Sequence, residues 1–228
     1  MRYSALLLDA DDTIFDFAAA ERYSIRKVLA FAGIEDPAAP EVYHRINAGH
    51  WRALERGETT QERLKVERFR DLAAHYGCDC DPAVMTDIFV GALSTRRDLI
   101  PGAVEAVAAI ARHMPVAIVT NGISQVQHGR FDSSPIMKHV SALVISGETG
   151  YAKPDPRLLF AALDRLGGIA PEKALVIGDS LTSDIAAANA AGIDAFWYNP
   201  GRKPLPGKYV ISGELHSIGE AVSAALAD

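Results

Sequence analysis

Short apolar runs that end at small or polar residues recur along the chain and predict the strands of a parallel sheet. Residues 3–8 lead into acids, residues 116–119 lead into Thr120, and residues 174–177 lead into Gly178. Two further runs, 143–145 and 195–198, extend the same sheet. Continuous apolar character suits strands that are buried on both faces. We therefore expect the functional groups at the carboxyl ends of these strands.

Helical patterns separate the predicted strands. They cover residues 103–113, 156–166 and 184–191, and Gly192 closes the last of them. Repeated alternation of strand and helix predicts an α/β fold, a Rossmann-like parallel sheet with helices on both faces. Ligands in such folds bind beyond the carboxyl ends of the strands.

Residues 17–97 interrupt this alternation. Helical patterns occupy residues 18–32, 40–55, 60–76 and 82–96, and Gly33, Gly57 and Gly77 separate them. The pattern predicts an all-helical cap domain at 17–97, a four-helix bundle, inserted into a catalytic core made of 1–16 and 98–228. Because the insertion leaves the core directly after the first acids, we expect it to act as a lid over the sheet.

Composition narrows the class of protein. The 228 residues are 49% apolar, which allows one substantial core and a smaller second one. A formal net charge of −6 disfavours a nucleic-acid polymer as partner. No signal peptide or bilayer-spanning run is visible, so the sequence predicts a cytoplasmic protein, a monomer or homodimer, without membrane attachment.

The two cysteines, Cys78 and Cys80, are one residue apart. No second Cys or His pair follows at the spacing of a zinc site. Cysteines this close rarely form a disulfide. We expect two reduced thiols in a polar turn.

Acidic residues follow two of the predicted strands. Asp9 and Asp11 come after the first strand and, in extended backbone, face the same way, whereas Asp12 points elsewhere. Asp179 and Asp184 follow the strand at 174–177. Each cluster alone is compatible with a solvated acidic turn. Two clusters at strand ends favour one site in which the carboxylates converge.

Converging carboxylates require positive charge, because otherwise they repel one another and take up protons. Oxygen ligands without histidine or thiolate indicate a hard cation, and Mg²⁺ fits best. Lys153 precedes Pro154 and therefore lies in extended backbone, although a lone lysine is more often a surface charge. Residues 120–122, Thr-Asn-Gly, offer a hydroxyl and backbone N–H groups for phosphate, or simply a tight turn.

In this order, the segments resemble the motifs of the haloacid dehalogenase superfamily of phosphohydrolases, over the whole chain. The first motif is Asp-x-Asp-x-Thr, at residues 9–13, and the second is Thr120 at the end of a strand. Lys153 and the pair Asp179 and Asp184 complete the set. Four motifs in order are far more specific than any one of them.

The resemblance implies a mechanism. Asp9 is the nucleophile that forms an aspartyl phosphate, and Asp11 is the acid that protonates the leaving group and later the base that activates water. Mg²⁺ is held by Asp9, by the backbone carbonyl of Asp11 and by Asp179. Dehalogenating relatives lack an acid at the position of Asp11, so its presence favours a phosphatase.

The resemblance also implies how phosphate is bound. Thr120, the N–H of Asn121 or Gly122, and Lys153 contact the transferring phosphoryl oxygens. Asp184 orients Lys153 or a metal-bound water. A catalytically silent binding module would be expected to lose Asp9, Asp11 or Lys153.

Two details resemble the pyrimidine 5'-nucleotidase branch of the superfamily. Asp12 replaces a common glycine, and residues 47–51 with 56–58 are similar to that branch. This predicts a phosphomonoester substrate, a nucleoside 5'-monophosphate with pyrimidine preferred. The main alternative is a sugar-phosphate phosphatase, for example one similar to N-acylneuraminate-9-phosphatase. Phe15, Phe17 and Trp51 are candidates to stack on a base or to pack in the core.

Overall fold

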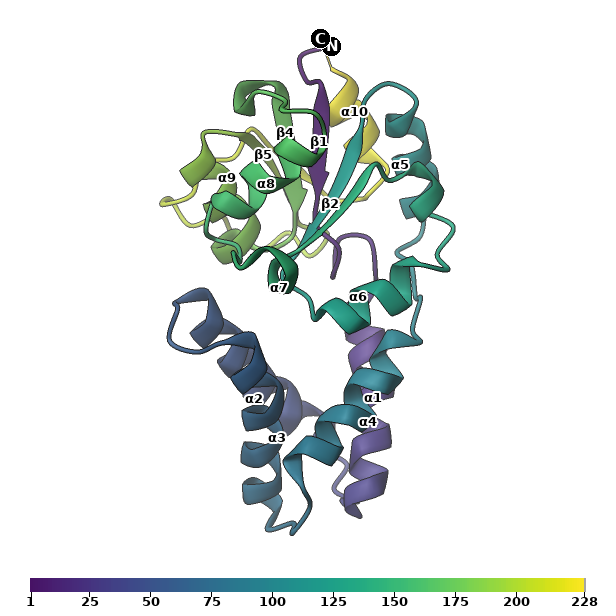
Figure 1. Cartoon of the computed structure of the whole chain (residues 1–228), viewed down its shortest axis with the longest axis vertical. Coiled ribbons are helices and arrows are strands. Elements are labelled where there is room, and N and C mark those ends of the chain that lie inside the picture. Colours follow the sequence, from purple (N-terminus) through teal and green to yellow (C-terminus); the bar gives the residue numbers. More distant parts are fainter. Residues whose placement is uncertain (228) are drawn as a thin grey trace. The chain divides into compact units, whose positions relative to one another are not determined.

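A computed structural model describes residues 1–227, which form two compact units. One unit contains Met1–Asp16, Asp98–Ser124 and the chain from Phe131 onward, and it holds the sheet. The other contains Phe17–Arg97 with Gln125–Arg130, and it is helical (Figure 1). Each unit has its own arrangement and is described separately.

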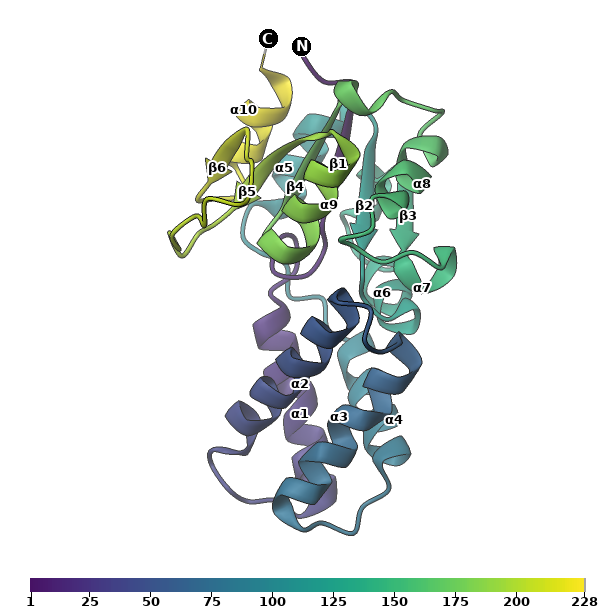
Figure 2. The ribbon, with the colours of Figure 1, turned by 90° about the vertical axis from the view of Figure 1, so that its left-hand side faces the viewer.

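The first unit is built on a sheet of six parallel strands in the order β3-β2-β1-β4-β5-β6 (Figure 2). The strands are β1 (Ala5–Leu8), β2 (Val116–Thr120), β3 (Ala142–Ile145), β4 (Ala174–Gly178), β5 (Asp194–Tyr198) and β6 (Gly213–Leu215). β1 lies between β2 and β4, and Leu8 pairs with Ile118 on one side and Ile177 on the other. The strand order reverses direction here, so the segments that follow β1, β2 and β4 open into one crevice.

The two faces of the sheet have separate apolar cores. On β1, Leu6 and Leu8 belong to one core and Leu7 to the other, and all three are at most 1% exposed. Burying each leucine contributes about 1.5–3 kcal/mol. α5 (Ala103–Ala111) and α10 (Glu220–Leu226) cover the first face, whereas α8 (Arg157–Arg165) and α9 (Ala186–Ala191) cover the second (Figure 1). The predicted α/β fold with helices on both faces is confirmed.

Short elements complete this unit. They are α6 (Ser124–Phe131), which is shared with the helical unit, η1 (Met137–His139), α7 (Ser146–Thr149), η2 (Pro171–Lys173) and η3 (Leu181–Ile185). The sequence pattern did not predict these elements, nor β6 and α10. Each has eight residues or fewer, so it spans too few positions to display a period.

The helical unit contains α1 (Phe17–Ala32), α2 (Ala39–Glu55), α3 (Gln61–Tyr76) and α4 (Pro82–Ser94). The predicted four helices match these within a few residues, because local signals fix their ends. The Thr60 side chain accepts a hydrogen bond from the N–H of Arg63 at the start of α3, and Asp81 does the same for Ala83 at α4. Gly77, with φ of 62°, ends α3 in the left-handed conformation.

A polar chain crosses the interior of the helical unit. The Asn47 amide donates to Glu21 Oε1 (2.7 Å), and Asn47 Oδ1 accepts from Arg68 Nη1 (3.0 Å). Arg68 is 1% exposed, and its guanidinium lies 4.6 Å from the ring centre of Phe89. This series of hydrogen bonds therefore joins α1, α2 and α3 through a buried guanidinium.

Cys78 and Cys80 are joined by a disulfide in the loop between α3 and α4. The expectation of two reduced thiols is wrong. The chain turns after Gly77 and brings the two Cα atoms to 5.4 Å, inside the range that a disulfide spans. In residues 1–227, no helix is both long enough and apolar enough to cross a membrane.

Candidate active site

Lys153 joins the ends of three strands. Its ammonium donates hydrogen bonds to Asp9 Oδ1 (2.6 Å), to Asp184 Oδ1 (2.6 Å) and to the carbonyl of Val119 (2.7 Å). These three bonds use all three of its donors. The N–H of Asp9 in turn donates to the carbonyl of Ile177 (2.9 Å). A residue that appeared as a lone lysine in the sequence is 3% exposed and bridges two carboxylates.

The segment after β2 fixes the backbone of Lys153. Asn121 donates from its side chain to the carbonyl of Lys153 (2.7 Å) and accepts from the N–H of Lys153 (2.8 Å). Thr120 Oγ1 accepts from the N–H of Gly122 (2.9 Å). The structure thus brings residues 120–122 beside Lys153. The two side-chain bonds of Asn121 could not be predicted from the sequence, because asparagine at a strand end is typical of any turn.

The acids of the two clusters meet at one place. Carboxylate oxygens of Asp9, Asp179 and Asp184 lie within 4.8 Å of one another. Asp184 is held by Lys153 and by the N–H of Ser180 (3.0 Å), and it is 2% exposed. These ligands are all hard oxygens. The donor set therefore fits Mg²⁺ rather than a metal that prefers nitrogen or sulfur ligands.

The cluster is short of positive charge. Burial, with repulsion from Asp184, raises the pKa of Asp9 to about 7, and burial, with repulsion from Asp9, raises the pKa of Asp179 to about 9. Burial opposes the charge of Lys153, but Asp184 and Asp9 raise its pKa above the ordinary value. The ammonium alone leaves protons on the acids near neutral pH. A divalent cation would replace those protons, which supports the fit to Mg²⁺.

The turn after Asp9 has a backbone that usually requires glycine. Asp12 has φ of 59°, and its N–H donates to the carbonyl of Phe15 (2.8 Å). Aspartate tolerates this left-handed region better than most residues. Asp11 is half-buried, and its charge adds to the raised pKa of Asp9. Asp12 thus preserves the turn that a glycine would form, and the charge of its exposed carboxylate adds to the raised pKa of Asp179.

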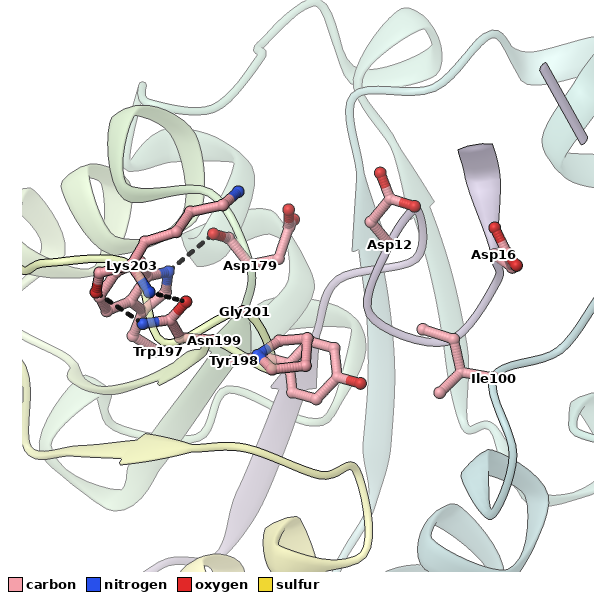
Figure 3. A pocket seen from close by; sticks show the side chains of 10 residues that line it. Asp12, Asp16, Ile100, Asp179, Trp197, Tyr198, Asn199, Gly201 and Lys203 are labelled. Carbon is pink, nitrogen blue, oxygen red and sulfur yellow. Dashed lines mark hydrogen bonds between the residues drawn. The ribbon is translucent and has the colours of Figure 1, made fainter. Parts of the chain in front are cut away.

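A pocket of about 280 Å³ adjoins Asp179 (Figure 3). Its lining includes the carboxylates of Asp12 and Asp16 and one cation, Lys203. The side chain of Asn199 bonds both the carbonyl (2.9 Å) and the N–H (3.0 Å) of Lys203, and Asn199 is 2% exposed. This pocket could not be predicted from the sequence, because the loop after β5 has no periodic pattern.

Comparison with known proteins decides the family. The family model of the haloacid dehalogenase-like hydrolases matches residues 3–192. The chain belongs to the haloacid dehalogenase-like hydrolase family. The predictions of family, fold class and enzyme class are confirmed.

Three relatives of this hydrolase are similar over most of their length. The HAD-hydrolase YfnB of Bacillus subtilis (strain 168) is 34% identical, over 96% of this chain and 94% of YfnB. A crystal structure of YfnB bound to magnesium superposes with a TM-score of 0.92, at 32% identity, and covers 99% of this chain and 100% of that one. The pyrimidine 5'-nucleotidases PynA of Streptococcus pneumoniae (strain ATCC BAA-255 / R6) and YjjG of Escherichia coli (strain K12) are 33% and 28% identical, over 88% and 90% of this chain and 85% and 90% of their own.

Among the aromatic residues predicted to stack or pack, Phe15 packs. It is fully buried in the core of the sheet unit of this hydrolase, edge-on to Phe131 with ring centres 4.9 Å apart. A stacking role for Phe15 is therefore wrong. Phe17 and Trp51 are half-buried in the helical unit.

Gly178 is the last residue of β4 and lies against Asp184. A Cβ atom at this position would overlap the carboxylate of Asp184, which Lys153 and Ser180 hold in place. We expect Gly178→Ala to displace Asp184, and with it Lys153, and to lower kcat by about 10 to 100-fold, as when a partner of a site residue is removed. Initial-rate kinetics measures this change.

Gly91 offers a matched control for Gly178→Ala. It lies inside α4 with open space around the position of a Cβ. Gly91→Ala should leave kcat unchanged and stabilise the helix by about 0.5–1 kcal/mol. Equal kinetics for Gly178→Ala and the wild type would show that Asp184 does not need its observed position.

The raised pKa values predict how stability depends on pH. Between about pH 5 and 9 the folded metal-free chain keeps protons on Asp9 and Asp179 that the unfolded chain has released, so its free energy of unfolding should fall as pH rises. Mg²⁺ competes with those protons, and its stabilisation should grow over the same range. Thermal melts in chelator and in excess Mg²⁺, at about pH 5, 7 and 9, test both trends.

Asp179→Asn serves as the comparison in these melts. The amide does not titrate, so the pH dependence in chelator should flatten and the increase in Tm with Mg²⁺ should shrink. A wild-type Tm in chelator that stays constant across this range would contradict the raised pKa values.

Proposed function

We propose that this hydrolase is a Mg²⁺-dependent phosphatase of nucleoside 5'-monophosphates, with pyrimidine nucleotides preferred. The observation that carries the phosphatase proposal is the buried Lys153 between Asp9 and Asp184, next to Asp179. Such a site can neutralise a phosphate while keeping a carboxylate poised to attack it. Similarity to the pyrimidine 5'-nucleotidases PynA and YjjG supports the nucleotide as substrate.

Asp9 acts as the nucleophile. A lone pair of its carboxylate forms a bond to phosphorus, and the bond from phosphorus to the ester oxygen breaks with its electron pair on that oxygen. Asp11 donates a proton to this oxygen, so the nucleoside leaves as a neutral alcohol. In the second half, Asp11 takes a proton from water as the water oxygen attacks phosphorus. The aspartyl phosphate then breaks down to Asp9 and inorganic phosphate.

Fixed positive charge supports both halves of the reaction. Lys153, the hydroxyl of Thr120 and the N–H groups of Asn121 and Gly122 stabilise the phosphoryl oxygens. Asp184 and the side chain of Asn121 position Lys153, which agrees with their hydrogen bonds to it. Lys153 also screens the negative charge of Asp9 from that of the phosphate, so that attack is possible.

The carboxylates of Asp9 and Asp179 and the carbonyl of Asp11 would hold Mg²⁺. When bound, the ion would supply charge neutralisation at a phosphoryl oxygen and keep Asp9 ionised. The oxygen ligands and raised pKa values of the cluster support this assignment. A YfnB structure bound to magnesium supports it further.

The helical unit is proposed to be a cap that selects the leaving group. In this proposal residues 17–97 form the cap and residues 1–16 with 98–228 form the catalytic core. Phe17 and Trp51, half-buried in the helical unit, remain candidates to contact a base. We further propose that the protein acts in the cytoplasm on small phosphomonoesters, as a monomer or homodimer.

A phosphate-release screen in Mg²⁺ over ribo- and deoxyribonucleoside 5'-monophosphates and sugar phosphates tests the proposal. We expect the largest kcat/KM for pyrimidine nucleotides, and no release in excess chelator. Faster turnover of sugar phosphates, N-acylneuraminate 9-phosphate included, would reject the nucleotidase proposal and keep the phosphatase. No phosphate release from any monoester would reject both.

A further inference from the structure

A second hollow lies on the sheet unit, and no step of the proposed reaction uses it. Its volume is about 380 Å³. Most side chains that line it are of two kinds: the apolar Ala108, Ala111 and Val140, and the basic Arg112, Lys138 and His139. Ser141 adds a hydroxyl. No acid is among these lining residues. Its size falls in the range of small-molecule sites.

The basic residues of this hollow have no ionic partner within residues 1–227. Arg112 and Lys138 are exposed. Among residues 1–227, no ion pair or side-chain hydrogen bond involves Arg112, Lys138 or the side chain of His139. Elsewhere in the same unit, Arg2 and Arg157 each pair with an aspartate. In a chain with a net charge of −6, unpaired cations that share one hollow make a local positive potential. That potential favours an anion.

The hollow lies at the opposite end of the strands from the catalytic acids. Arg112 ends α5, ahead of β2, and Ser141 precedes β3, where its N–H donates to the carbonyl of Val116 (2.8 Å). Asp9 and Thr120 instead stand at the carboxyl ends of β1 and β2. The five residues of β2 separate the two ends by about 16 Å. A ligand in the hollow is therefore distinct from the substrate at Asp9.

We propose that this hollow is a second binding site, for a small organic anion with a phosphate-type head group on a compact apolar body. Arg112 and Lys138 bind the head group, since a guanidinium and an ammonium together match the charge of a dianion. His139 and Ser141 add donors. The methyl groups of Ala108, Ala111 and Val140 contact the apolar body, which inorganic phosphate lacks.

Backbone amide NMR with phenylphosphonate tests this site separately from the catalytic one. Its carbon–phosphorus bond resists ester hydrolysis, so the protein can be titrated without turnover. We expect saturable shifts at residues 108–112 and 138–141, with weaker binding of inorganic phosphate and of benzoate. Shifts confined to the residues around Asp9 and Thr120, or no shifts, would overturn the proposal. Benzoate binding as tightly as phenylphosphonate would overturn the phosphate-type head group.

Variants distinguish a built site from general charge. The double variant Arg112→Gln with Lys138→Gln should weaken binding in the hollow by about tenfold or more, because two charge-assisted hydrogen bonds are lost. Lys173→Gln, an exposed cation in η2 outside the hollow, should leave it unchanged. Phosphatase activity should persist in both variants, which separates failure of this site from failure of the proposed function. If Lys173→Gln weakened binding equally, the loss would come from the net charge of the protein and the proposed site would be overturned.

Discussion

Asp9→Asn removes turnover: phosphate release should fall by about 10⁴-fold or more, as for loss of a nucleophile that acts within a catalytic unit. The amide keeps the shape of Asp9 but has no lone pair basic enough to attack phosphorus. Substrate binding should survive, because the variant loses a negative charge near the phosphate while Lys153 keeps Asp184 as its partner. Initial rates and titration calorimetry with the substrate measure these two effects.

Asp12→Asn is the matched control for this substitution. Asp12 lies in the same turn with an exposed carboxylate, and asparagine also tolerates its φ of 59°. The activity of Asp12→Asn should remain within about tenfold of that of the wild type. Acid-quenched intact mass spectrometry should detect a phosphoryl group on the wild type and on Asp12→Asn, but not on Asp9→Asn. Turnover that persists in Asp9→Asn would assign the attack to another group.

The sheet and the position of the acids could be predicted because they rest on local, repeated signals. A run such as residues 5–8 is apolar on both sides, so it reads as a buried strand before any partner is known. Strand ends in a parallel sheet share one edge, which is why Asp9 and Asp179 could be expected together. The helices of the helical unit were equally accessible, since Thr60, Gly77 and Asp81 mark their ends.

Features that depend on contacts far apart in the sequence could not be predicted. Nothing around Asn121 indicates that its side chain holds a lysine 32 positions away. The loop that carries Lys203 is fixed by Asn199, whose own position depends on β6, a strand of three residues. The prediction of two reduced thiols was wrong for a related reason. Whether Cys78 and Cys80 meet depends on the backbone path of the turn rather than on their separation in sequence.

The hydrogen bonds of Lys153 also limit how this residue can contact the phosphate. Its ammonium has no donor left for phosphate while it bonds Asp9, Asp184 and Val119. Contact with a phosphoryl oxygen therefore requires that one of these bonds be exchanged. The bond to Asp9 is the natural candidate, because the Asp9 oxygen loses its charge when it bonds to phosphorus. Lys153 would then follow the charge from the nucleophile to the phosphoryl group.

Asp11→Asn should separate the two halves of the reaction. The amide cannot protonate an alcohol, so phosphate release from a nucleoside monophosphate should fall by about 10² to 10⁴-fold, the range for general acid–base catalysis. p-Nitrophenyl phosphate needs no such proton, because its leaving group departs as a stable anion. With this ester the variant should release one equivalent of nitrophenolate rapidly and then stall, since Asp11 is also the base for hydrolysis of the aspartyl phosphate. Rapid-quench kinetics measures the burst.

The comparison between the two esters is what makes this prediction specific to a proton donor. If Asp11 served only to hold the turn or its backbone carbonyl, Asp11→Asn would slow both esters equally and no phosphorylated protein would accumulate. Asp12→Asn, in the same turn, should continue to turn over after the first equivalent and should keep the wild-type ratio of the two rates. A stall after one equivalent that is confined to Asp11→Asn would place the proton transfer on that carboxyl, since Asp12→Asn changes the neighbouring residue in the same turn.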